Sequence, residues 1–271
     1  MGQGFRPKSS RLKRAFGAIS GRANTTAKRA RRLESVRTRY HEREGGWGDN
    51  PPEGRRYKQF DAFYGWKAMK EQAWKSFRLA EPIAAKHRVK LAVENHNDWR
   101  IDDLLEFVEG IKSEWFGLCL DTVNSIALLE DPLETASTLV PYVFTTHVKD
   151  MGLMEYSDGF LLWEVPLGSG FLDLNRIFHL CENENPKVQF CLEMITRDPL
   201  EITCLTQDYW ATLQVVEPRQ LARALQMVRA DISDGPLPKI SNRLSNSQLA
   251  FEEYNIRLCL KHAEKRLGFT G

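Results

Sequence analysis

The sequence predicts an α/β fold built from repeated strand–helix units, of the kind that close into an α/β barrel. Four short apolar runs each end in a side chain that can bind a metal ion. The first three of these side chains lie 27 and 26 residues apart, about one strand–helix unit, and the fourth follows after 46 residues. The four runs are residues 91–94, 118–121, 144–147 and 190–193.

The individual elements follow from apolar periodicity. Residues 60–87 carry aromatic and aliphatic side chains at helical spacing, which predicts one long amphipathic helix. The four apolar runs are nearly continuous, as expected for parallel strands covered on both faces. Segment 149–169 is predicted to be a long loop. The other elements are strands at 89–94, 116–121, 142–147 and 188–193, helices at 102–111, 133–139, 172–182, 209–229 and 249–266, and a polar loop at 231–246.

The start of the chain differs in composition from the rest. Residues 1–56 hold 15 Lys and Arg against 5 Asp and Glu, whereas the remaining residues hold 23 and 31. We interpret this segment as a basic, largely irregular N-terminal extension with one candidate helix at 27–40. A solvated extension is favoured over a nucleic-acid-binding arm, although clustered basic side chains could neutralise phosphates. The predicted organisation is therefore 1–56 extension, 57–230 barrel region, and 231–271 C-terminal loop and helix.

Length and composition set broader limits. A chain of 271 residues with 42% hydrophobic residues can bury a substantial core, and its net charge of +2 indicates no particular partner. Five cysteines without a CxxC pair favour reduced thiols and a cytoplasmic location over a disulfide framework. No run of 18 apolar residues occurs, so we expect no membrane span.

The residues that end the apolar runs form a candidate metal site. Parallel strands of a barrel point the same way, so side chains at their C-terminal ends converge on one mouth. Two glutamates, one aspartate and one histidine make a mixed oxygen and nitrogen site that suits Mn²⁺, Mg²⁺, Co²⁺ or Zn²⁺. The four residues are Glu94, Asp121, His147 and Glu193.

Short motifs around these residues occur in a fixed order: Val-Glu-Asn-His at 93–96, Leu-Asp-Thr-Val-Asn at 120–124, Thr-His-Val-Lys-Asp at 146–150, Val-Pro-Leu-Gly-Ser-Gly at 165–170, and Leu-Glu-Met at 192–194. Over residues 55–211 the chain resembles the sugar phosphate isomerase/epimerase superfamily, the xylose-isomerase-like TIM barrels. That group includes ketose 3-epimerases, inosose dehydratase, hydroxypyruvate isomerase and, more distantly, endonuclease IV. The resemblance implies TIM-barrel-like (β/α) units with the four metal ligands on strands five to eight.

The resemblance also implies roles for individual residues. A divalent cation would stabilise an enediolate, while Glu94 and Glu193 serve as the catalytic base and acid. The expected ligand is a small-molecule sugar or sugar phosphate. The candidate substrate-binding residues are His96, Asn124, Lys149 and Arg197.

Three functions remain open on these grounds. The first is a metal-dependent isomerase or epimerase acting on a sugar or sugar phosphate. The second is a lyase of the inosose dehydratase type, which would expel water from the same intermediate. The third is a non-catalytic half-barrel or pseudo-enzyme. Phosphodiester cleavage of the endonuclease IV type is disfavoured, because that chemistry needs many histidine ligands, and so nucleic acid is disfavoured as a partner.

The length of the first half limits the barrel. Four strand–helix units should precede residue 89, which by usual unit lengths requires about 100 residues or more. Only 88 residues are present, and 1–56 lack alternating strands and helices. We therefore predict an incomplete barrel that contains strands five to eight. Because a half barrel exposes two sheet edges, pairing with a second copy as a homodimer is one expected outcome.

Overall fold

The computed structural model describes residues 65–269, apart from residues 212, 214–215, 233–236 and 242–243. The predicted N-terminal extension and its candidate helix lie outside these described residues. The chain divides into two compact units, Pro52–Leu260, and Met1–Pro51 together with Lys261–Gly271. Every described strand belongs to the first of these units.

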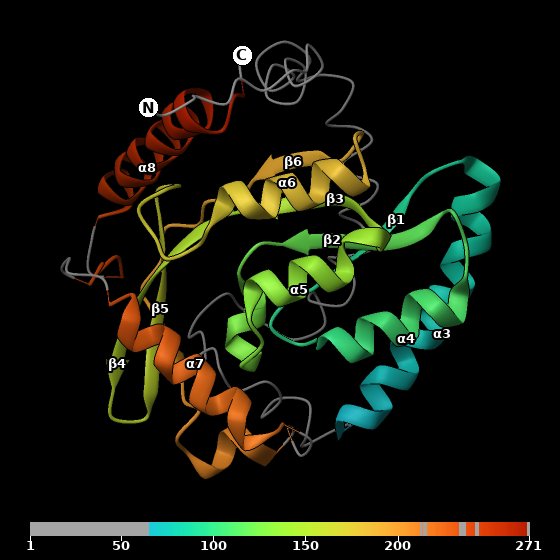
Figure 1. The fold of residues 1–271 in the computed structure, drawn as a ribbon, viewed down its shortest axis with the longest axis horizontal. Coiled ribbons are helices and arrows are strands. Elements are labelled where there is room, and N and C mark those ends of the chain that lie inside the picture. Colours follow the sequence, from blue (N-terminus) through green and yellow to red (C-terminus); the bar gives the residue numbers. More distant parts are fainter. Residues whose placement is uncertain (1–64, 212, 214–215, 233–236, 242–243, 270–271) are drawn as a thin grey trace, which may run out of the picture. The chain divides into compact units, whose positions relative to one another are not determined.

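The four predicted strands form one parallel sheet (Figure 1). They are β1 (Leu91–Glu94), β2 (Phe116–Asp121), β3 (Val143–Val148) and β6 (Gln189–Leu192), in the order β1-β2-β3-β6. Among the described residues β1 and β6 are the outer strands, so the sheet is partial and not closed. The α/β prediction is confirmed, and an open sheet is consistent with an incomplete barrel.

Helices follow the strands and cover one face of the sheet (Figure 1). The helix α4 (Ile101–Ile111) buries Leu104 and Phe107, and α5 (Pro132–Leu139) begins with a proline after the capping residue Asp131. In α6 (Leu174–Glu184), Phe178 packs edge-on against Phe190 of β6, with ring centroids 4.6 Å apart. The helix α3 (Gly65–His87) lies against α4. Two 3₁₀ turns, η2 (Asn124–Leu128) and η3 (Val140–Tyr142), flank α5 in the chain.

The prediction of a long loop at 149–169 was wrong. This segment forms an antiparallel hairpin of β4 (Asp150–Tyr156) and β5 (Gly159–Val165), and β7 (Leu200–Ile202) pairs with β5. The two-residue turn is Ser157-Asp158, which joins Tyr156 to its partner Gly159, and Gly159 adopts a positive φ of 149°. Burial of Phe160 and Leu162 in the core stabilises the hairpin. The strand–helix repeat of the sequence does not predict this hairpin.

The predicted helix at 209–229 is shorter in the structure. A 3₁₀ turn, η4 (Gln207–Ala211), is followed by α7 (Pro218–Ala230). Pro218 explains the later start, since proline fits the first turn of a helix but lacks the N–H that an interior position needs. The final helix, α8 (Ser245–Arg266), begins four residues before the predicted position.

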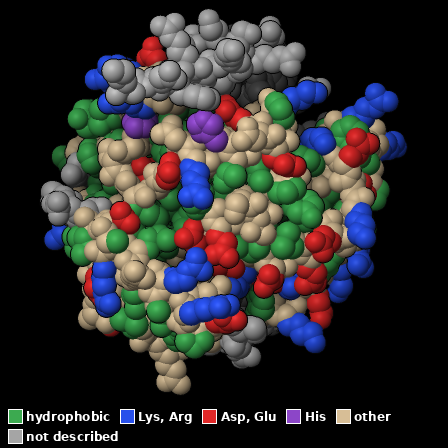
Figure 2. All heavy atoms as spheres, in the orientation of Figure 1, with side chains coloured by type: hydrophobic (Ala, Val, Ile, Leu, Met, Phe, Trp, Pro, Cys, Tyr) green, Lys and Arg blue, Asp and Glu red, His purple; other side chains and the backbone are tan. Residues whose placement is uncertain are grey.

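The surface of the described residues carries charges of both signs. On the face drawn in Figure 2, acidic and basic side chains are interspersed and form no field of a single sign. None of the described helices combines the length and the apolar character that crossing a membrane requires.

Candidate metal centre

The four predicted metal ligands meet at the C-terminal edge of the parallel sheet. Glu94, Asp121, His147 and Glu193 each offer one ligand atom, and these atoms all lie within 4.8 Å of one another. Glu94 and Asp121 end β1 and β2, His147 lies directly opposite Asp121 on β3, and Glu193 follows β6. The convergence is a direct consequence of parallel pairing, because every strand delivers its last residues to the same edge.

Asp121 is the most deeply buried of the four. Its Oδ1 accepts hydrogen bonds from the backbone N–H groups of Val123 and Asn124, both at 2.9 Å. Its Oδ2 lies 2.9 Å from Nζ of Lys149. Burial raises the pKa of Asp121 to about 6, although the ammonium of Lys149 opposes this shift. The carboxylate is therefore held in one orientation by fixed partners on both oxygens.

His147 lies between the two glutamates. Its Nδ1 is 3.3 Å from Oε1 of Glu94 and 3.2 Å from Oε2 of Glu193. Hydrogen bonding with Cys119, and with these two glutamates, raises the pKa of His147 to about 12. Although burial alone would raise the pKa of Glu193, its contacts with His147 and Lys149 lower that pKa to about 2.

This arrangement fits a divalent cation. Three carboxylates and one imidazole are ligands that Mg²⁺, Mn²⁺, Co²⁺ and Zn²⁺ accept in different proportions. A proton on Nδ1 of His147 would lie between two glutamate oxygens, and a cation bound among these atoms would take the place of that proton. The four side chains are therefore compatible with a divalent metal ion, but they do not identify which one.

The predicted substrate-binding residues lie in two different environments. Asn124 and Lys149 are buried and contact the ligands: Nδ2 of Asn124 donates to Oε1 of Glu94 at 3.3 Å, and Nζ of Lys149 is 3.2 Å from Oε2 of Glu193. His96 has a side chain that is 57% exposed, two residues beyond Glu94. The guanidinium of Arg197 lies 3.9 Å from Oε1 of Glu164. A direct contact of any of the four with substrate stays a prediction.

Three residues that were not predicted from the sequence also belong to this region. Glu164 on β5 is a buried carboxylate whose Oε2 accepts from the backbone N–H of Ile195, two residues after Glu193. Burial raises the pKa of Glu164 to about 7 while the charge of Lys149 opposes the shift. A single acidic residue inside the apolar run at 160–165 was the available signal. The other two, Asn95 and Thr122, are buried and directly follow the ligands Glu94 and Asp121.

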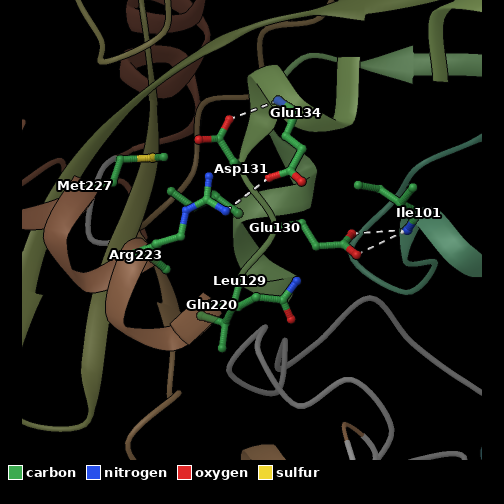
Figure 3. Close-up of a pocket in the computed structure, with 10 residues that line it drawn as sticks. Ile101, Leu129, Glu130, Asp131, Glu134, Gln220, Arg223 and Met227 are labelled. Atoms are coloured by element: carbon green, nitrogen blue, oxygen red, sulfur yellow. Dashed lines mark hydrogen bonds and ion pairs between the residues drawn. The ribbon is translucent and has the colours of Figure 1, made fainter. Parts of the chain in front are cut away.

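A surface hollow that none of the four candidate ligands lines lies between η2, the start of α5 and α7 (Figure 3). Its charged side chains already have partners. Glu130 accepts from Nε of Arg100 and from the backbone of Ile101, and Arg223 lies 3.4 Å from Glu134. We assign no ligand to this hollow, because its polar groups satisfy one another.

Comparison with known proteins places the chain in a family. A family model described as xylose isomerase-like TIM barrel matches residues 23–229, and the chain belongs to this family. The match begins within residues 1–56, the segment that was interpreted as an extension. The boundary between that extension and the barrel region stays a prediction. Membership establishes the TIM-barrel-like fold class.

Individual relatives are more distant. The chain is 26% identical over 148 residues to 3-oxo-isoapionate decarboxylase from Pectobacterium atrosepticum. This alignment covers 53% of this chain and 54% of that protein. The chain therefore spans about half the length of this curated relative. A xylose isomerase-like TIM barrel protein from Mycobacterium smegmatis, solved in complex with magnesium, has 21% identity and a TM-score of 0.43, covering 67% of this chain and 55% of that chain. A D-tagatose 3-epimerase-like protein has 15% identity and a TM-score of 0.40, covering 64% and 60%.

Proposed function

We propose that the protein is a divalent-metal-dependent isomerase or epimerase that acts on a sugar or sugar phosphate through an enediolate. The observation that carries this proposal is the convergence of Glu94, Asp121, His147 and Glu193, with ligand atoms within 4.8 Å of one another. A divalent ion held there would supply positive charge beside the substrate carbonyl, where negative charge develops. Family membership supports the same class of chemistry.

Glu94 and Glu193 are the proposed proton-transfer groups. In the metal-free chain, contacts with His147 lower the pKa of both carboxyl groups below the usual value, against the effect of burial. One carboxylate removes the proton from the carbon next to the carbonyl, the electron pair of the broken C–H bond forms a C=C bond, and the π pair of the carbonyl moves to its oxygen. Return of a proton to the same carbon from the opposite side gives an epimer. Return to the former carbonyl carbon gives an isomer, provided that the hydroxyl proton of the first carbon moves to the former carbonyl oxygen.

Decarboxylation of a 3-oxo sugar acid is a second candidate. The observation that favours it is the 26% identity to 3-oxo-isoapionate decarboxylase. Loss of CO₂ from a 3-oxo acid leaves its electron pair on the carbon next to the ketone, so the same site would stabilise the same kind of anion. Arg197 is the proposed partner of the substrate carboxylate, since its guanidinium could bind a carboxylate through two N–H groups. Dehydration of the inosose dehydratase type is retained as an alternative lyase reaction.

Glu193→Gln tests the proposal directly. The purified chain is supplied with Mn²⁺ and incubated with ketoses, ketose phosphates and 3-oxo sugar acids, and products are analysed by mass spectrometry and chromatography. Isomerisation conserves substrate mass, dehydration loses water, and decarboxylation loses CO₂. We expect turnover in the unaltered chain and its loss, by at least about 100-fold, in Glu193→Gln, because a positioned acid–base group contributes about 10²–10⁴-fold.

Glu184→Gln is the matched control, since Glu184 is an exposed glutamate at the end of α6. It should keep full turnover. Equal turnover in Glu193→Gln and the unaltered chain would contradict the assignment of Glu193. Tight Mn²⁺ binding without turnover of any substrate would favour the non-catalytic alternative.

The proposed partners are a small-molecule substrate and a second copy of the chain. The outer strands β1 and β6 of the described sheet do not pair with each other, and open sheet edges favour pairing between molecules. We expect light scattering of the purified protein to give about twice the chain mass of 31.2 kDa. A mass of a single chain across a range of concentrations would contradict the homodimer.

A further inference from the structure

Two residues that directly follow metal-ligand candidates hold the ends of neighbouring strands together. The first is Asn95, which follows Glu94 at the end of β1. Its backbone N–H donates to the carbonyl of Cys119 at 3.3 Å. Its side-chain Oδ1 accepts from the backbone N–H of Asp121 at 2.6 Å, and its Nδ2 donates to the carbonyl of Asp121 at 3.0 Å. The amide therefore binds both backbone polar groups of the next ligand.

The second residue, Thr122, repeats this pattern one strand further on. It follows Asp121 at the end of β2, and its backbone N–H donates to the carbonyl of His147 at 3.0 Å. Its Oγ1 accepts from the backbone N–H of Lys149 at 3.0 Å and donates to the carbonyl of Lys149 at 2.7 Å. In both cases the backbone bonds one residue of the next strand, and the side chain bonds the residue two positions later.

These contacts extend strand pairing past the point where the backbone ladder stops. The ladder between β1 and β2 ends at Glu94, and the ladder between β2 and β3 ends at Asp121, so each ligand lies at the end of its ladder. Asn95 and Thr122 are each 2% exposed, so their hydrogen bonds are shielded from water and are costly to lose. Between β3 and β6 the equivalent backbone bond is made by Glu193, whose N–H donates to the carbonyl of Val148 at 3.0 Å.

From this repeated pattern we infer that Asn95 and Thr122 are positioning residues of the metal centre. Asn95 fixes the distance between Glu94 and Asp121, and Thr122 fixes Asp121 relative to the strand end that carries His147 and Lys149. Neither residue is one of the four candidate ligands. The inference rests on the proposed function, because it takes the four side chains to be metal ligands.

The chain offers a matched control for each residue. Asn185 also binds the main chain of another element through its amide: Nδ2 donates to the carbonyl of Val143 at 3.1 Å, and Oδ1 accepts from the backbone N–H of Lys187 at 3.0 Å. Asn185 is the C-cap residue of α6, and Val143 is the first residue of β3, at the opposite edge of the sheet from the candidate ligands. Thr135 is a buried threonine of α5 whose hydroxyl donates to the carbonyl of Asp131, the N-cap of that helix.

The test measures Mn²⁺ affinity, the electron paramagnetic resonance spectrum of bound Mn²⁺, and the thermal unfolding midpoint of the metal-free chain. The variants are Asn95→Ala and Thr122→Val, with Asn185→Ala and Thr135→Val as controls. We expect the first two to weaken Mn²⁺ binding by about 10- to 100-fold and to change the spectrum, as loss of groups that orient ligands does elsewhere. The controls should bind Mn²⁺ as the unaltered chain does, even where their unfolding midpoints fall equally.

Thr122→Ser keeps the hydroxyl and should restore most of the affinity lost in Thr122→Val, which guards against a variant that fails to fold. Unchanged affinity and spectrum in the folded Asn95→Ala and Thr122→Val variants would overturn the inference while leaving the proposed function intact. Equal loss in the controls would also overturn it, because the effect would then reflect general stability. Failure of the unaltered chain to bind Mn²⁺ would overturn the proposed function and the inference together.

Discussion

At the scale of single residues, the convergence of the four candidate ligands was predictable because parallel strands bring their C-terminal residues together whatever their neighbours are. The same rule does not predict whether the side chains of Asn124 and Lys149 are buried or exposed. The depth of a side chain depends on which groups surround it, and Lys149 is drawn among Asp121 and Glu193 by their charges. Glu164 belongs to the same network, but the hairpin that places it was not predicted.

The buried carboxyl group of Glu164 makes stability depend on pH. Its pKa is raised from 4.5 to about 7, mainly by burial, so the folded chain holds its proton more tightly than the unfolded chain does. The stability from this group is fully present below pH 4.5 and is lost as pH rises through about 7. The shift corresponds to an upper limit of about 3 kcal/mol.

We therefore expect Glu164→Gln to remove the loss of stability that the Glu164 carboxyl group causes as pH rises. Relative to the unaltered chain, the free energy of unfolding of the variant should increase between pH 5 and pH 8. Urea unfolding of the metal-free proteins at both pH values measures this, with the exposed Glu184→Gln as a control. A difference between variant and unaltered chain that stays constant with pH would contradict the role given to the Glu164 carboxyl group.

At the scale of elements, the four parallel strands and the first three helices after β1 were predictable because each has a single strong period. The β4–β5 hairpin was not, because its apolar residues were interpreted only as part of a connection between strand–helix units. Its alternation is visible in Phe160 and Leu162, which face the core from β5. The start of α7 depended on Pro218, whose effect outweighed the apolar periodicity of the longer segment.

Asp150, the first residue of β4, anchors the loop that follows the hairpin. Its carboxylate accepts from the backbone N–H groups of Met151, Gly168, Gly170 and Leu172. Asp150→Asn would replace one accepting oxygen by an NH₂ group that faces N–H donors. We expect a loss of about 1–3 kcal/mol in the free energy of unfolding, the cost of a buried unsatisfied polar group.

Asp173→Asn is the matched control for this prediction. Asp173 accepts a single hydrogen bond, from the backbone N–H of Arg176, as the N-cap of α6. Asparagine caps helices about as well as aspartate, so this variant should lose little stability. Urea unfolding compares the two, and an equal small change in both would show that Asp150 is not the anchor we describe.

At the scale of the whole molecule, the fold and the proposed chemistry are linked through the metal centre. The four ligands come from four strands of one sheet, and Glu94 and Glu193 lie 99 residues apart in the chain. An unfolded chain cannot hold these side chains within 4.8 Å of one another, so a cation that needs all four binds only the folded state. Sequence spacing predicted the sheet, but family membership was needed to support the barrel class, because the described sheet is open.

Mn²⁺ should consequently stabilise the whole sheet. A ligand that binds only the folded state raises the free energy of unfolding by about 2.7 kcal/mol when present at 100 times its dissociation constant. We expect this increase in urea unfolding of the unaltered chain and of Glu184→Gln, and its loss in Glu193→Gln, which lacks one charged ligand. If Mn²⁺ stabilised Glu193→Gln as much as the unaltered chain, the ion would be binding elsewhere. Because the four ligands come from β1, β2, β3 and the end of β6, the increase should be seen equally by tryptophan fluorescence and by far-ultraviolet circular dichroism.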